Sequence, residues 1–297
     1  MNDYLQAWFL PMMISALGLG IYDICKKHAV KDNSVTAVLF LATLTGSVIF
    51  VIYALFSGKL SLILACPWQH QLLLLLKSML VASSWMCVYY AMRTMPISIV
   101  SPIRASSPLW TFLGAMILYG EFPTILQLLA MVMVFAGYIG LTLLGKMEGF
   151  SLKNSPAMYM IFLGTLLGAA SALYDKYLLA RLNMPAFTVQ FYYAVDLVIV
   201  LGVSYLVRSL FSRVKHPFQW RWSIPATGIM VLIADYSYFY ALSLGDAPIS
   251  ILSLVRRSSC IFAFALGAYI FKDKNIYRKS IALVFILIGV IILGLAK

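Results

Sequence analysis

Apolar residues occur along the chain in runs of about 20, separated by short polar or Gly/Pro-containing segments. A helix needs about 20 apolar residues to cross a hydrocarbon core of about 30 Å. The sequence lacks the polar–apolar alternation typical of membrane β-barrels. The pattern therefore predicts an all-α membrane protein with ten transmembrane helices. These lie near residues 5–27, 35–56, 71–93, 97–119, 124–145, 156–179, 186–208, 222–243, 248–270 and 277–296.

The composition supports this interpretation. The 297 residues are 63% hydrophobic and 11% charged, whereas soluble domains are about 45–50% apolar and roughly 25% charged. Four cysteines, at positions 25, 66, 87 and 260, form no CxxC pair and are interpreted as small apolar side chains. We therefore expect a multi-pass protein of the lipid bilayer, with the bacterial inner (plasma) membrane as its predicted location.

The net charge of +12 does not indicate nucleic-acid binding, because no soluble segment interleaves Lys and Arg with aromatic residues. Lys and Arg flank membrane spans and contact anionic lipid. Most of the 22 Lys and Arg residues lie in loops after the odd-numbered spans. The positive-inside rule then predicts both termini outside the cytoplasm. Lys77, near the start of the third span, is expected to extend its ammonium to the interface.

The two halves of the chain repeat each other at an offset of 152 residues. "PISIVSPIRASSP" (96–108) matches "PISILSLVRRSSC" (248–260), and the same offset carries Asp23 onto Asp175. In the third and eighth spans "YYAM" (89–92) matches "FYAL" (239–242) at an offset of 150. Such matches predict a duplication of five spans, with residues 1–147 and 148–297 as the repeats. Because five is odd, the second repeat must enter the membrane from the opposite face, as in many secondary transporters.

The fourth-span segment "SSPLWTFLGAMILYGE" (106–121), followed by "TILQLLAMVMVFAGYIGLTLL" (124–144), resembles the EamA-type transporters of the drug/metabolite transporter (DMT) superfamily. The second copy departs from this pattern, with Cys260 in place of the proline and Lys272-Asp273 in place of Gly-Glu. The resemblance implies ten helices in two inverted halves around a central cavity, and alternating access for small organic metabolites. It does not imply a particular substrate.

Two predicted ion pairs follow from the repeat. An arginine inside lipid costs from about 2.5 to over 10 kcal/mol, so it needs protein or water around it and usually a partner. Asp23 and Arg104 lie near one face, and the repeat places Asp175 and Arg256 correspondingly near the other. The pairs have three interpretations: permanent salt bridges, gates that open in alternation, or a substrate clamp in which arginine binds a carboxylate or phosphate.

Further candidate residues break the repeat symmetry. Arg257 aligns with Ala105 and is the better candidate for binding a substrate anion, unless it pairs with Asp235 or Asp196. Either carboxylate could carry a coupling proton or bind a substrate amine. Aromatic side chains expected to line the cavity could stack on a ligand or hold an amine by cation–π contact. The predicted substrate-binding residues are Arg257, Arg256, Arg104, Asp235, Asp196, Trp85, Tyr90, Tyr240 and Trp110.

The sequence favours a secondary transporter of a small anionic or zwitterionic metabolite, such as an amino acid or organic acid, with protons as a candidate coupling ion. The alternative within the same class is export of cationic or amphipathic drugs by buried aspartates and aromatics. An intramembrane lipid enzyme is a remote alternative, because the three histidines lie in loops and no HExxH or GxSxG motif occurs. We expect no cofactor, no metal and no nucleic-acid partner; a monomer and a homodimer both fit.

Overall fold

The computed structural model describes residues 7–31, 33–94, 103–104, 106–145, 156–211, 218–245, 247–259, 262, 281, 284–289 and 291–292. Within these ranges all regular secondary structure is helical. The elements are α1 (Phe9–Val30), α2 (Val35–Phe56), α3 (Leu60–Leu64), α4 (Trp68–Thr94), α6 (Ser107–Tyr119), α7 (Ile125–Gly145), α8 (Pro156–Lys176), the π-helix η2 (Tyr177–Arg181), α9 (Ala186–Phe211), α10 (Ser223–Ser243) and α11 (Ile249–Arg257).

The helices agree closely with the expected spans. Helices α1, α2, α4, α7, α8, α9 and α10 each coincide with one apolar run. Helices α6 and α11 cover parts of the fourth and ninth runs, and residues 284–289 and 291–292 of the tenth run are helical. Most of the remainder of those three runs, and the expected boundary between residues 147 and 148, lie outside the described residues. The short helix α3 was not expected.

The protein is an integral multi-pass membrane protein. In the described part of the chain, five helices are long and apolar enough to cross a membrane: α1, α2, α4, α8 with η2, and α9. Large apolar side chains such as Phe56, Ile117 and Leu210 are exposed on the outside of the bundle. A bilayer would cover this surface, because its hydrocarbon core is as apolar as these side chains.

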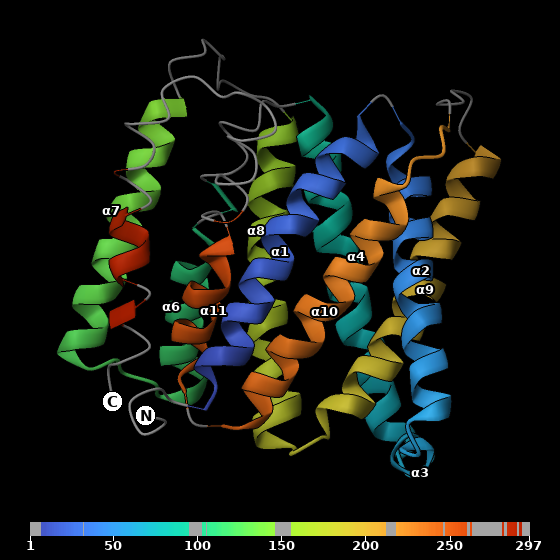
Figure 1. Ribbon diagram of the computed structural model, residues 1–297, viewed down its shortest axis with the longest axis horizontal. Coiled ribbons are helices and arrows are strands. Elements are labelled where there is room, and N and C mark those ends of the chain that lie inside the picture. Colours follow the sequence, from blue (N-terminus) through green and yellow to red (C-terminus); the bar gives the residue numbers. More distant parts are fainter. Residues whose placement is uncertain are drawn as a thin grey trace.

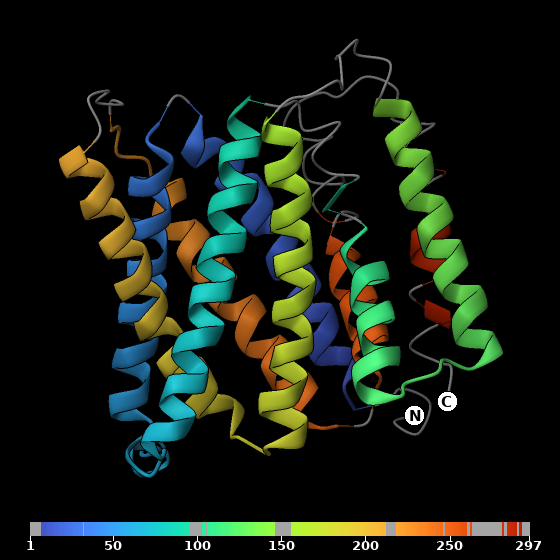
Figure 2. The same ribbon diagram turned by 180° about the vertical axis from the view of Figure 1, so that it is seen from behind.

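The helices stand side by side and alternate in direction (Figure 1). In that view α1 runs upward, whereas α8, which occupies the corresponding place in the second half of the sequence, runs downward. Helix α1 packs against α10, and α4 packs against α8. Helices α2 and α9 contact each other at one end, and α6 contacts α11 toward the other, where α7 lies outermost (Figure 2).

Small residues allow the closest helix contacts. Helices α2 and α10 approach so closely that a Cβ added at Gly228 would overlap the carbonyl oxygen of Ala42, and one at Gly46 would lie 2.7 Å from the Gly228 oxygen. The Ser15 hydroxyl of α1 donates to the Ala234 carbonyl of α10 at 2.7 Å. Backbone contact of this kind is how helices associate in lipid, where burial of apolar surface gives little driving force.

We predict that Gly228→Ala separates α2 from α10 and destabilises the folded protein by about 1–3 kcal/mol, the usual cost of overpacking. The measurement is the melting temperature of the purified protein in detergent. Gly168→Ala is the matched control, because a Cβ there would meet only the Ser84 hydroxyl, at 3.4 Å. Equal melting temperatures for the two variants would contradict the prediction.

Candidate functional site

A central cavity of about 140 Å³ lies among α1, α4, α8 and α10 and the inner ends of the helical segments at residues 103–104 and 249–257. Three carboxylates and five basic side chains line the cavity, so its formal charge is positive. They are Asp23, Asp175, Asp235, Lys26, Lys77, Arg104, Arg256 and Arg257.

The first group of charges, which we call the Asp23 cluster, consists of Asp23, Lys26, Arg104 and Arg257. Asp23 and Lys26 are three residues apart on α1 and therefore share a helix face. The Lys26 ammonium donates to the Asp23 carboxylate at 2.5 Å, and an Arg104 guanidinium nitrogen lies 3.9 Å from the same oxygen. Arg257 is close enough to interact electrostatically with both Asp23 and Lys26. Two cations thus contact one carboxylate, and a third acts on it electrostatically.

Aromatic rings enclose the lysine of this cluster. The Lys26 nitrogen lies 4.4 Å from the centre of the Tyr22 ring and 5.6 Å from that of Tyr89. The two tyrosine hydroxyls are hydrogen-bonded to each other at 2.9 Å. Trp85 extends this wall, with its ring centre 6.5 Å from that of Tyr22. The Lys26 ammonium is therefore held by a carboxylate on one side and by π faces on another.

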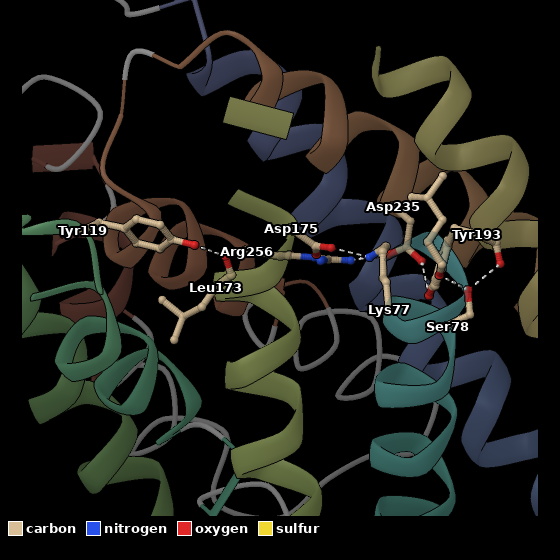
Figure 3. Close-up of polar contacts among 9 residues, drawn as sticks. Lys77, Ser78, Tyr119, Leu173, Asp175, Tyr193, Asp235 and Arg256 are labelled. Carbon is tan, nitrogen blue, oxygen red and sulfur yellow. Dashed lines mark hydrogen bonds and ion pairs between the residues drawn. The ribbon is translucent and has the colours of Figure 1, made fainter. Parts of the chain in front are cut away.

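The second group, which we call the Asp175 cluster, consists of Asp175, Lys77, Asp235 and Arg256 (Figure 3). The Lys77 ammonium donates to the Asp175 carboxylate, and the Arg256 guanidinium donates to that of Asp235. The Tyr193 hydroxyl also donates to Asp235, at 3.4 Å. Lys77 is 1% exposed, Asp175 4% and Asp235 6%. Two cations and two carboxylates balance each other in this cluster.

Aromatic rings also surround the cations of the Asp175 cluster. The Lys77 nitrogen lies 4.3 Å from the Tyr193 ring centre and 4.4 Å from that of Phe239. The Arg256 guanidinium lies 4.2 Å from the centre of the Tyr238 ring. The rings exclude water and interact favourably with cations, which offsets part of the cost of burying these charges.

Only one of the two expected ion pairs is formed in this structure. Asp23 and Arg104 lie together, whereas Asp175 is paired with Lys77 and Arg256 with Asp235. The expectation that Lys77 extends to the interface was wrong, because its ammonium is buried and reaches Asp175 across the contact between α4 and α8. The partners observed in place of the expected ones are Lys77 and Asp235. At both positions the two halves of the sequence differ.

Of the other predicted residues, one lines the cavity and four do not. Trp85 lines the cavity, whereas Tyr90, Tyr240, Trp110 and Asp196 are not among its lining residues. Helix geometry explains two of these differences, because consecutive residues differ by about 100° around the axis. Tyr89 faces the cavity and Tyr90 instead lies under Arg208, with the guanidinium 4.9 Å from its ring centre.

The same rotation separates Phe239, which lines the cavity, from Tyr240, which is 50% exposed. Trp110 packs edge-on against Phe162, with ring centres 5.6 Å apart. Asp196 lies on α9, and its buried Oδ2 accepts no hydrogen bond from the residues that the structure describes.

The sequence interpretation missed both cavity lysines. Lys26 was counted with the loop charges, although its position three residues after Asp23 places it on the same helix face. Nothing in the local sequence around Lys77 indicates that its ammonium is buried, because its partner lies 98 residues away in the chain. Among the described residues, no group of three His, Cys, Asp or Glu side chains could hold a metal ion.

A separate set of contacts joins the two halves at the face where α6 and α8 end and α11 begins, which we call the lower face after Figure 1. Glu121 forms an ion pair with Lys176, and its other carboxylate oxygen accepts the backbone N–H of Ile249 at 3.1 Å. The Tyr119 hydroxyl donates to the Leu173 carbonyl at 2.6 Å. One glutamate thereby links three helix ends, including the N-terminus of α11, where negative charge is favoured.

We predict that Asp235→Asn destabilises the protein by about 3–5 kcal/mol, because it leaves the partly buried Arg256 guanidinium without its carboxylate partner. The double variant Asp235→Asn/Arg256→Gln should recover most of this loss. Melting temperatures of the wild type, both single variants and the double variant provide the double-mutant cycle. Additive effects of the two substitutions would show that the pair is not coupled.

Comparison with known proteins supports the fold and the family. No curated protein matches the chain. A solved structure described as "Crystal structure of protein" superposes with a TM-score of 0.74 over 96% of this chain and 96% of that chain, at 16% sequence identity. Residues 6–143 match the model of the EamA-like transporter family. This match supports the EamA-type transporter family of the DMT superfamily, which the fourth and fifth spans predicted.

Proposed function

We propose that this protein is a secondary active transporter that moves a small anionic or zwitterionic organic molecule through its central cavity by alternating access. The excess of positive charge in the cavity is the observation that carries the proposal: five basic side chains face three carboxylates. A lining with more cations than carboxylates favours the binding of a negatively charged cargo. An organic acid or an amino acid is the cargo class that fits the charge and the small volume.

The two charge clusters of the cavity differ in their ratio of cations to carboxylates. The Asp175 cluster holds two cations and two carboxylates, whereas the Asp23 cluster holds Lys26, Arg104 and Arg257 with a single carboxylate. Guanidinium groups bind carboxylates and phosphates through two parallel hydrogen bonds. Arg104 is only partly buried, with 24% of its side chain exposed, and so remains accessible from the cavity. We propose this cluster as the site for the anionic group of the cargo.

The rival proposal, export of cationic drugs, has less support. It requires a carboxylate that is available to a cargo cation. Asp23 contacts Lys26 and Arg104, Asp175 contacts Lys77, and Asp235 contacts Arg256. Each carboxylate that lines the cavity already has a cationic partner from the protein. Asp196 is the carboxylate with an oxygen that lacks a hydrogen bond within the described residues, and we propose it as the better candidate for a coupling proton.

Two inverted five-helix repeats are proposed as the architecture that supports alternating access. In the proposed repeat, α1, α2, α4 and α6 correspond to α8, α9, α10 and α11. The contact α1–α10 then has α8–α4 as its counterpart, α6–α8 has α11–α1, and α2–α10 has α9–α4. All six contacts occur. The opposite directions of α1 and α8 also support inversion (Figure 1). A transporter built from inverted repeats can adopt two related states. In each state the cavity is open to one face of the membrane and closed to the other.

The lower-face contacts are proposed as one of the two gates. Glu121, Lys176 and the N-terminus of α11 would separate when the cavity opens to this face. On the other side of the cavity, the long contact between Arg104 and Asp23 fits a pair that forms and breaks during transport. These two places differ from the symmetric pair of gates that was one of the three interpretations of the sequence.

We predict that carboxylate-bearing metabolites raise the melting temperature of the wild type by about 2–4 °C at roughly tenfold excess over Kd, because they bind only the folded state. The Arg257→Gln variant should lose this shift. Arg208→Gln is the control, because Arg208 packs on Tyr90 outside the cavity. A stabilising compound should then be taken up by proteoliposomes. Cations that stabilise wild type and Arg257→Gln equally, with no effect of anions, would contradict the proposal.

We predict that Glu121→Gln opens the lower face more often. In a variant whose four native cysteines are replaced by alanine, a membrane-impermeant maleimide should label Ser171→Cys, in the cavity wall, roughly fivefold faster if the contact contributes about 1 kcal/mol. Lys59→Gln is the control, because Lys59 is an exposed residue outside the gate. An unchanged labelling rate would exclude Glu121 from the gate.

A further inference from the structure

The two lysines of the cavity occupy sites of the same chemistry. Each ammonium contacts an aspartate and two aromatic rings: Asp23, Tyr22 and Tyr89 for Lys26, and Asp175, Tyr193 and Phe239 for Lys77. A carboxylate combined with aromatic faces is the arrangement by which proteins recognise substituted ammonium ions. Both ammonium groups are almost fully buried, with 2% of each side chain exposed.

The repeat relates the walls of these two sites. Asp23 corresponds to Asp175 at the offset of 152 residues, and Tyr89 corresponds to Phe239 at the offset of 150. In each half of the chain, therefore, the aspartate of one helix and the aromatic residue of another form the same cation site. The duplication accounts for the two sites, because both walls were present in the unit that was copied.

The repeat does not relate the lysines that fill the sites. Lys26 corresponds to Leu178, and Lys77 corresponds to Thr227. Lys26 reaches its aspartate along α1, whereas Lys77 reaches its aspartate from α4 across to α8. The two sites have thus acquired an ammonium group by different routes, one within a helix and one between helices. A shared requirement for a cation at each aspartate explains this better than inheritance of a single ion pair.

We propose that Lys26 and Lys77 are tethered ammonium groups that occupy two cation sites of the cavity and exclude amines from them. Removal of either lysine opens its site to a free primary alkylammonium ion. This inference deepens the proposed function. It rests on that function in one respect, namely that the cavity is the site of the cargo. It narrows the cargo to an anion without an ammonium group, because an amino acid would find both cation sites filled.

The structure suggests a matched probe. Lys77→Ala removes the side-chain atoms from Cγ to Nζ, which are the atoms of n-propylamine. n-Propylammonium should therefore fit the vacated space, with its charge beside Asp175 and its alkyl chain where the lysine stem lay. 1-Propanol has the same length without the charge, and it separates an ammonium site from a simple cavity.

The experiment measures melting temperatures of the full-length protein in detergent. We expect n-propylammonium to raise the melting temperature of Lys77→Ala by about 2–4 °C when present at roughly tenfold excess over Kd. It should have no effect on the wild type or on Lys77→Ala/Asp175→Asn, and 1-propanol should have no effect on any of them. The same shift in all three proteins, or no shift in Lys77→Ala, would overturn the proposal for this site.

A second variant covers the case in which Lys77→Ala does not fold. Lys26→Ala leaves Asp23 with Arg104 nearby and with 33% of its side chain exposed, so its charge is less costly to leave without the lysine. We expect n-propylammonium to stabilise this variant but not Lys26→Ala/Asp23→Asn. Absence of the shift here overturns the proposal. The anion screen on the wild type is independent of these variants, so failure of the proposed cargo class would be recognised separately.

Discussion

The cost of burying charge inside a membrane protein organises this structure. An ion moved into a low-dielectric interior is destabilised by several kcal/mol unless a partner and hydrogen bonds compensate for the lost water. The three carboxylates that line the cavity all contact a lysine or an arginine, and the helix contacts at the centre of the bundle bring these partners together. The helices that pack together at the centre of the bundle are therefore also the helices that carry the paired charges.

The two charge clusters differ in a way that matters for transport. The Asp175 cluster is balanced, and its lysine and both carboxylates are buried, so it is suited to hold α4, α8, α10 and α11 together. The Asp23 cluster carries more cations than carboxylates and is more exposed, so it is suited to attract an anion. A site of this kind discriminates by charge before it discriminates by shape, because electrostatic interactions are strong where water is scarce.

The two halves of the chain, which we propose as inverted repeats, agree in some features and differ in others. Helix packing is preserved under exchange of the halves, and so are the aspartate and the aromatic ring of each lysine site. The cations are not preserved, since Lys26, Lys77 and Arg257 have uncharged counterparts. The scaffold keeps its symmetry because each helix contact depends on many residues. The site loses its symmetry because a single substitution is enough to move a charge.

The sequence by itself determined the helices, their approximate bounds and the membrane environment, and it indicated the family that the match supports, because runs of about 20 apolar residues and the motif of the fourth span are local signals. It also indicated that Arg104, Arg256 and Asp235 face a common interior, since charges in apolar spans must avoid lipid. Only the tertiary structure decided the pairing. Lys77 joins Asp175 and Arg256 joins Asp235 because partners depend on helix rotation and on contacts between helices far apart in the sequence. The same rotation, about 100° per residue, placed Tyr89 in the cavity and Tyr90 outside it.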